Sequence, residues 1–283
     1  MIAVALGLVA ALSWGTADFA ARFSGRAIGP ALTLLLVTLT GSGLLGLWLA
    51  VIGPGLPAAL SLPAFLYGLF SLIGTLALYQ GLARAPICTV APMAAAYPAW
   101  SLAYMAAFDG LRPNAWQLAA MALVIAGVMV VARAAKDETA EAEGRGWHGP
   151  VLGLAAGMFF GFTLVSGLHA TEIHGQVQAL WLARTVGVVM MLPTLWLARG
   201  QALPAPRWIM TAAGQGVLDS LAFMSVLAAG APQDAAIASV VSSSFGIVTI
   251  ALARLFLKER VVPAQWGGIV LTFAGVTILS ALG

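Results

Sequence analysis

The chain has 283 residues, of which 61% are hydrophobic and only 8% charged, too few charges to cover a soluble protein of this size. Its net charge of +3 comes from Lys and Arg residues scattered singly over short stretches, which argues against a nucleic-acid-binding surface. A single cysteine, Cys88, excludes an internal disulfide and cysteine-rich metal sites. The composition is that of an integral membrane protein, with the lipid bilayer as its partner.

Apolar runs of about 20 residues suit helices that cross a hydrocarbon core about 30 Å thick. Ten such helices are predicted, at 2–20, 30–52, 62–83, 86–108, 115–132, 149–170, 177–198, 208–230, 235–256 and 264–282. The first has no preceding basic residues, so it is interpreted as a membrane helix instead of a signal peptide. Most connections are short and rich in Gly and Pro, and only residues 134–147 form a polar linker.

The linker separates two similar halves, residues 1–133 and 148–283, with five predicted helices each. The small residues Gly7, Ala11 and Gly15 correspond to Gly153, Gly157 and Gly161, and Ala83-Arg84-Ala85-Pro86 corresponds to Ala229-Gly230-Ala231-Pro232. Because five is odd, the second half enters the membrane in the opposite orientation to the first. We therefore expect an all-α membrane protein with ten transmembrane helices in two inverted five-helix repeats around a central cavity, as in many secondary transporters.

Basic residues indicate an orientation because cytoplasmic loops are enriched in Lys and Arg. The odd-numbered loops hold almost all of them, and the even-numbered loops hold Arg112 alone. This bias predicts cytoplasmic odd-numbered loops and both termini outside the cell.

Asp219 lies deep inside the predicted helix 208–230, where an isolated carboxylate is costly and is by default a functional candidate. Thr211, Gln215 and Phe223 share its helix face at intervals of four residues. Arg184, in the preceding antiparallel helix, lies at a similar depth and could pair with Asp219. The pair is interpreted either as a structural link between two helices or as a substrate-binding or proton-coupling site.

Further cavity candidates are aromatic and hydroxyl side chains at helical spacing. The alternative for the rings is packing at an interface, and for the hydroxyls it is bonding to their own backbone. The small-residue faces are interpreted as packing surfaces, and Pro92 and Pro98 as a helix bend. The candidates, besides those on the Asp219 face, are Trp14, Ser71, Thr75, Tyr79, Tyr97, Trp100, Ser101, Tyr104, Phe160, Thr163, Ser239 and Ser243.

Other polar residues are weaker candidates for the binding site. Asp18, His169 and Glu172 lie near predicted helix ends and are expected to be solvated at the membrane interface. No spacing predicts a metal site, a cofactor-binding loop or a nucleophile beside a base, so neither a cofactor nor an enzyme is expected.

Several motifs resemble one transporter family. They are Trp14-Gly15, the run Ala235-Ala236-Ile237-Ala238-Ser239-Val240-Val241, Leu257-Lys258-Glu259-Arg260, Gln265-Trp266-Gly267-Gly268 and Gly275-Val276. Together they are similar to the EamA-like branch of the drug/metabolite transporter superfamily. The first half departs from the pattern, because it has Asp109-Gly110-Leu111-Arg112 where the family has a glutamate.

The resemblance implies a ten-helix basket whose cavity is lined by helices one, three, four, six, eight and nine. It also implies termini in the cytoplasm, opposite to the orientation from the charges, and a location in the bacterial inner membrane. The implied function is export of amino acids or similar small metabolites, as in the aromatic amino-acid exporters called YddG. The alternatives are a multidrug exporter of lipophilic cations and, more distantly, a membrane-embedded enzyme or scaffold. A monomer is compatible with each.

Overall fold

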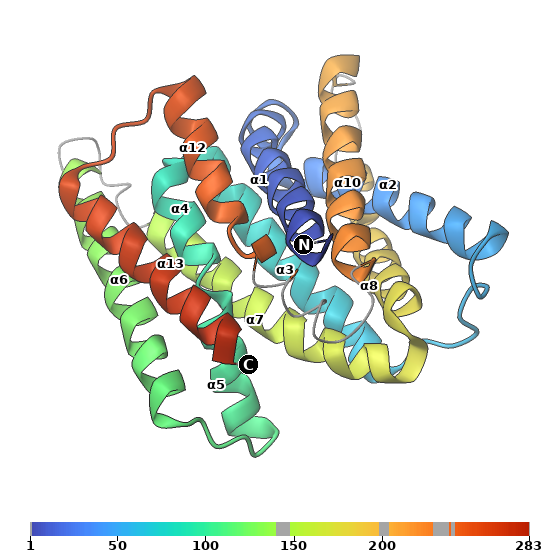
Figure 1. Ribbon diagram of the computed structural model, residues 1–283. Helices are drawn as coiled ribbons and strands as arrows, with labels where there is room; N and C mark the ends of the chain where they lie inside the picture. Colours follow the sequence, from blue (N-terminus) through green and yellow to red (C-terminus); the bar gives the residue numbers. More distant parts are fainter. Residues whose placement is uncertain (1, 140–147, 198–203, 229–237, 239–240, 283) are drawn as a thin grey trace.

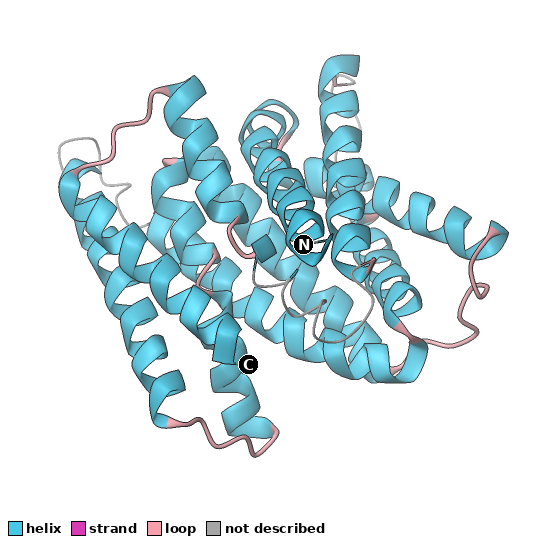
Figure 2. Ribbon diagram, viewed as in Figure 1, coloured by secondary structure: helices cyan, strands magenta, loops and turns pink. Residues whose placement is uncertain are grey.

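The computed structural model describes residues 2–139, 148–197, 204–228, 238 and 241–282. Helices make up almost all of these ranges, which contain no strand (Figure 2). Seven of the helices found there are long and apolar enough to cross a membrane. The prediction of an all-α membrane protein is therefore confirmed.

The described helices are shown in chain order in Figure 1, and the connection between the second and the third is a loop of ten residues, 52–61. They are α1 (Ile2–Ile28), α2 (Pro30–Val51), α3 (Leu62–Arg84), α4 (Ile87–Ala94), α5 (Tyr97–Phe108), α6 (Ala115–Thr139), α7 (His148–His174), α8 (Gln176–Met191), α9 (Pro193–Leu197), α10 (Pro206–Leu227), α12 (Phe245–Leu257) and α13 (Pro263–Leu282).

Local sequence sets several helix boundaries. Gly29 has a φ of 83°, a conformation that side chains rarely adopt, and it lets α2 follow α1 after a single residue. Ser61 starts α3, where its side chain accepts a hydrogen bond from the Ala64 backbone N–H at 3.3 Å. Pro98 cannot donate a helical hydrogen bond, and the chain breaks just before it, between α4 and α5.

Five predicted helices differ from the structure, and one of them is the ninth, predicted at 235–256, where a turn at Ser243 and Ser244 precedes the start of α12 at Phe245. The first extends to Ile28 instead of ending at 20, the fourth is divided into α4 and α5, and the seventh is divided at Pro193 into α8 and α9. The fifth continues to Thr139, into the predicted linker. The rest of the linker, at 140–147, and the junction at 229–232 lie outside the described residues.

Helices of the two halves pack on one another throughout the molecule. α3 packs mainly on α7, α6 on α13, and α1 on α10 and α12 (Figure 1). The glycines of α1 and α7 allow this close approach: a Cβ atom on Gly15 would lie 2.6 Å from Val248 Cβ, and one on Gly161 would lie 2.6 Å from Trp100 Cβ. Small residues on one helix face thus serve packing, as predicted.

Large apolar side chains cover much of the outer surface. Examples are Leu47, Trp116, Met210 and Leu255, each more than 60% exposed. Such continuous apolar exposure marks a surface that contacts another apolar medium. The interior, in contrast, holds most of the polar side chains discussed below.

Candidate functional site

A cavity of about 400 Å³ lies among α1, α2, α3, α7, α8 and α10. One end is formed by Asp18 on α1 and Tyr79 on α3. From there it extends past the middle of the helices to Gln176, an exposed residue at the start of α8, so the cavity reaches the surface at that end. Its size and mostly apolar walls are typical of a small-molecule site.

Asp219 is the central acceptor of this cavity. Its Oδ1 atom accepts a hydrogen bond from Trp14 Nε1 at 2.8 Å, and its Oδ2 atom forms an ion pair with Arg184 Nη2. The three residues come from α10, α1 and α8, so the carboxylate joins both halves of the chain. An intramembrane charge held this way is neutralised and still borders an open volume.

Aromatic rings contact Arg184 and Trp14, the two residues that bind the Asp219 carboxylate. The Arg184 guanidinium carbon lies 5.3 Å from the centroid of the Phe223 ring, within the range of a cation–π interaction. The Trp14 ring meets Phe223 edge-on, with the centroids 4.9 Å apart. The ion pair is therefore held in a fixed geometry by rings that also line the cavity.

Gly41 on α2 makes the space that the Arg184 side chain occupies. A Cβ atom at this position would lie 2.8 Å from Arg184 Nη1 and 3.0 Å from its Cδ. Because Asp219 and Phe223 hold the guanidinium, we expect Gly41→Ala to displace it and lower transport by about tenfold, the effect of weakening one charge-assisted contact by about 1.4 kcal/mol.

A transport assay in liposomes would test this, with Gly43→Ala as the matched control, because a Cβ atom at Gly43 meets nothing within 4 Å. Equal rates for the two variants would show that the position of Arg184 does not matter.

Most of the residues predicted from the sequence border the cavity. They are Trp14, Ser71, Thr75, Tyr79, Tyr97, Phe160, Thr163, Arg184, Asp219 and Phe223. The spacing of four on α3 accounts for Ser71, Thr75 and Tyr79, since residues at that interval share one helix face.

The other predicted residues lie elsewhere. Trp100, Ser101 and Tyr104 do not border the cavity. Trp100 packs on Gly161, Ser101 donates to Pro98 O at 2.9 Å, and the Tyr104 ring contacts the Phe108 and Phe162 rings at tilted angles. Only the first residue of α5, Tyr97, reaches the cavity, because α5 continues along α7 after the break.

Two more predicted residues, Gln215 and Ser243, do not border the cavity. Gln215 is buried and donates to Ser24 Oγ at 2.8 Å, which ties α10 to α1. Ser243 is buried next to the start of α12 and does not border the cavity. Ser239 lies outside the described residues.

Asp18 is the main cavity residue that the sequence analysis placed incorrectly. It was expected at the solvated end of a helix ending at residue 20, but α1 continues to Ile28 and Asp18 borders the cavity. It lies four residues after Trp14, hence on the same helix face, and this spacing was the available signal. Tyr67, Thr38, Thr171, Gln176 and Phe245 also border the cavity without having been predicted.

A second polar cluster, which we call the Arg22–Glu259 cluster, joins α1, the α3–α4 junction and the segment after α12. The Glu259 carboxylate accepts hydrogen bonds from the backbone N–H groups of Ile87 and Cys88, both at 3.1 Å, at the start of α4. It also forms an ion pair with Arg22 Nη1 at 3.2 Å. A carboxylate is well placed there, because free N–H groups and the helix dipole favour negative charge.

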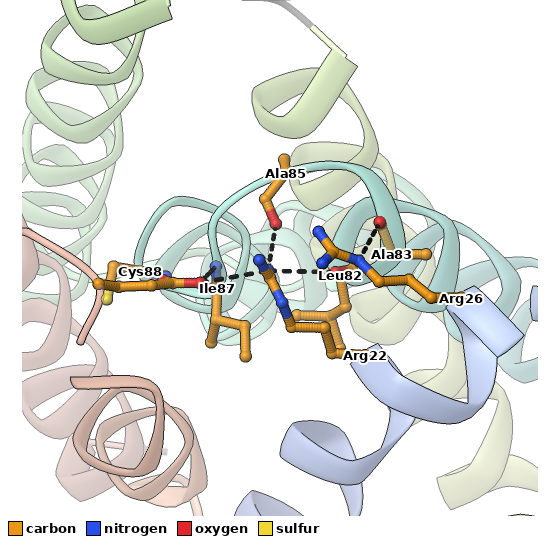
Figure 3. Close-up of polar contacts among 8 residues, drawn as sticks. Arg22, Arg26, Leu82, Ala83, Ala85, Ile87 and Cys88 are labelled. Carbon is orange, nitrogen blue, oxygen red and sulfur yellow. Dashed lines mark hydrogen bonds and ion pairs between the residues drawn. The ribbon is translucent and has the colours of Figure 1, made fainter. Parts of the chain in front are cut away.

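Two arginines of α1 complete the Arg22–Glu259 cluster (Figure 3). Arg22 donates to the carbonyl oxygen of Ala85 at 2.7 Å, and Arg26 donates to that of Ala83 at 2.7 Å. The side chains of Arg22 and Glu259 are only 12% and 10% exposed. The left-handed conformation of Lys258, with a φ of 53°, turns the chain so that Glu259 can reach α4.

The Arg22–Glu259 cluster lies just beyond the inner end of the cavity. Arg22 follows Asp18 by one helical turn, about 6 Å along α1. Leu82, whose backbone carbonyl accepts a second hydrogen bond from Arg22, lies three residues after Tyr79 on α3. The cluster therefore lies where it would close this end of the cavity, whereas Gln176, which borders the cavity at the other end, is exposed.

The geometry suits binding of a small amphipathic solute. Rings offer apolar contact, and the ion pair and hydroxyl groups offer polar contact, whereas no group of His, Cys, Asp and Glu in the described ranges could hold a metal ion.

Comparisons with known proteins agree with this picture. The sequence model of the EamA-like transporter family matches residues 1–133 and 147–281. No curated protein gives a significant match. Among 18 matching chains of solved structures, one crystal structure is 16% identical, with a TM-score of 0.64 over 99% of this chain and 97% of the other. At such low identity the likeness concerns the fold.

Proposed function

Because the chain belongs to the EamA-like transporter family, we propose that it is a secondary transporter that exports amino acids, aromatic ones included, or similar small metabolites. Transport would occur by alternating access across the inner membrane of a bacterium. The main support for the proposal is the Arg184–Asp219 ion pair in the wall of a cavity lined by aromatic rings.

An ion pair of this kind can exchange partners with a zwitterion. The ammonium group of an amino acid can replace Arg184 at the Asp219 carboxylate, while its carboxylate takes the guanidinium. The exchange leaves the net charge of the site unchanged. The free-energy cost of binding a zwitterion among apolar side chains therefore stays low. Trp14 and Phe223, which already contact the pair, would then face the side chain of the cargo.

Alternating access is supported by the two ends of the cavity. The Arg22–Glu259 cluster lies beyond one end, where it would close the cavity, and the exposed Gln176 borders the other end. In a ten-helix inverted repeat, rocking of one half against the other would open the closed end and close the open one. With the orientation that the charges predict, the closed end faces the cytoplasm.

A second candidate is export of lipophilic organic cations. The aromatic rings around the Asp219 carboxylate favour it, because aromatic faces attract cations as well as apolar groups. Counterflow into liposomes preloaded with single compounds separates the candidates. Exchange of amino acids supports the first, exchange of quaternary ammonium dyes alone supports the second, and exchange of neither compound class contradicts both.

Tyr97 and Tyr104 give a matched pair of variants for the cavity itself. Both lie on α5, but only Tyr97 borders the cavity. We expect Tyr97→Ala to change the relative counterflow rates of large and small amino acids by about tenfold, because removing a ring that borders the cavity costs a few kcal/mol of contact. Tyr104→Ala should leave the ratio unchanged, and a change of equal size in both variants would place recognition elsewhere.

A further inference from the structure

Tyr67 on α3 borders the cavity with a hydroxyl group that no contact uses. This hydroxyl forms no hydrogen bond with any residue that the structure describes. A tyrosine hydroxyl that is withdrawn from bulk water usually has a partner. Water can take this role until a polar group of the cargo displaces it. The Tyr67 hydroxyl is therefore free to bind the cargo.

The packing of α3 on α7 fixes where the Tyr67 ring lies. Gly167 of α7 leaves room for the ring, because a Cβ atom at Gly167 would lie 3.3 Å from both Tyr67 Cε2 and Tyr67 Cζ. The Cζ atom carries the hydroxyl group, and both residues border the cavity. The polar end of the ring is thus held at the cavity wall.

Tyr67 lies on the Arg184 side of the cavity. A Cβ atom on Gly68 would lie 2.6 Å from the Ala183 carbonyl oxygen, so α3 and α8 are in close contact there. These two residues are the sequence neighbours of Tyr67 and Arg184. Among the charged groups, Arg184 has the largest electrostatic effect on the Tyr67 hydroxyl, and Asp219 has a smaller one of opposite sign. The hydroxyl is therefore closer to the guanidinium side of the ion pair.

The Arg184 guanidinium also has a donor that the ion pair does not use. Its Nη2 atom binds Asp219, whereas its Nε atom is buried and has no acceptor among the described residues. A carboxylate has two oxygen atoms with about four acceptor positions, so it can bind a guanidinium and still accept an O–H donor. An ammonium group is repelled by Arg184. The donors on this side of the cavity therefore suit a carboxylate.

The position of Tyr67 along the cavity suits this role as well. Ser61, just before α3, shares a hydrogen bond of 2.9 Å with His174, so α3 begins at the Gln176 end. Tyr67 lies five residues from the start of α3, about 8 Å, and Arg184 lies eight residues from the start of α8, about 12 Å. A solute that enters past Gln176 therefore meets both residues at a similar depth.

We propose that Tyr67 is a second binding residue for the carboxylate of the cargo, and that it makes the cavity select compounds that carry a carboxylate beside their ammonium group. This rests on the proposed function, because it assumes that the cavity binds the cargo. In the exchange of partners described above, the carboxylate that takes the Arg184 guanidinium also accepts the Tyr67 O–H. Such charge-assisted hydrogen bonds are stronger than neutral ones, and an amine without a carboxylate cannot form this one.

The variant Tyr67→Phe tests the proposal, because it removes the hydroxyl and keeps the ring on Gly167. Phenylalanine and leucine are compared with 2-phenylethylamine and 3-methylbutylamine, which are the same molecules without the carboxylate. Binding to the purified full-length protein is measured by titration calorimetry. We expect the variant to bind the amino acids about tenfold more weakly and the amines less than about twofold more weakly. Comparing both ligand classes isolates the contact between hydroxyl and carboxylate.

Tyr104→Phe is the matched control, because it removes the same group from a tyrosine that does not border the cavity. It should bind all four compounds as the wild type does. Equal weakening of amino acids and amines in Tyr67→Phe would overturn the proposal, and so would unchanged binding of the amino acids.

Counterflow in liposomes with the wild-type protein separates this inference from the proposed function. If amino acids exchange but Tyr67→Phe keeps the wild-type preference for them over the amines, the inference is wrong and the proposed function stands. If none of the four compounds binds or exchanges, the proposed function is contradicted, and the inference with it.

Discussion

Asp219→Asn is expected to lower transport by about a hundredfold while the protein still inserts into the membrane. The substitution leaves the Arg184 guanidinium, whose side chain is 9% exposed, without its counter-charge. Removing one partner of a buried pair costs about 3 kcal/mol or more. Asn can still accept the hydrogen bond from Trp14, so the lower transport rate would result from removing the negative charge. Initial rates in proteoliposomes, normalised to the amount of inserted protein, would measure the effect.

A double variant separates a binding role from a structural one. Arg184→Met combined with Asp219→Leu removes both charges and keeps apolar volume, a change that is often neutral or stabilising for buried pairs. We expect its thermal stability to return to within about 1 kcal/mol of the wild type while transport stays lost. Wild-type transport by the double variant would show that the ion pair only holds α8 and α10 together.

Glu259→Gln is expected to open the closed end of the cavity. The amide has one acceptor oxygen for the two N–H groups of Ile87 and Cys88, and it has no charge for Arg22. Losing one charge-assisted hydrogen bond and one ion pair costs about 1.5–3 kcal/mol, enough to change the population of an open state by a factor of about ten or more.

Cys88 provides the measurement, since it is the only cysteine in the chain and its backbone N–H is bound by Glu259. Its residue is 1% exposed, so a maleimide should react slowly with the wild type. We expect reaction about tenfold faster in Glu259→Gln. Glu172→Gln, an exposed residue near the end of α7, serves as control. Equal labelling rates in all three proteins would show that the cluster does not hold this end closed.

Helix periodicity and depth predicted the centre of the site. Residues four apart share a helix face, which placed Ser71, Thr75 and Tyr79 together, and similar depths suggested that Arg184 and Asp219 could pair. Both arguments use distances along single helices, which are fixed by helix geometry. The structure brings these five residues to the same cavity.

Where the sequence analysis failed, the missing information concerned where helices end and how they pack. Asp18 was assigned to solvent because α1 was ended at residue 20, before Arg22 and Arg26, although Gly29 and Pro30 mark the true end at Ile28. Tyr97 and Tyr104 share a face at helical spacing, but only the position of α5 against α7 decides which of them meets the cavity. Glu259 lies far from α4 in sequence, so its contacts depended on the tertiary fold.

The Arg22–Glu259 cluster has a glutamate that the corresponding turn of the first half, Asp109-Gly110-Leu111-Arg112, lacks. The two ends of the carrier are therefore closed by contacts of unequal strength, and the unloaded protein should spend most of its time facing one side. An uncoupled carrier obeys detailed balance, so this bias cannot drive net flux by itself. It should instead give different KM and Vmax values for influx and efflux, with the same ratio Vmax/KM in both directions. A difference between the two ratios would reveal an energy source coupled to transport.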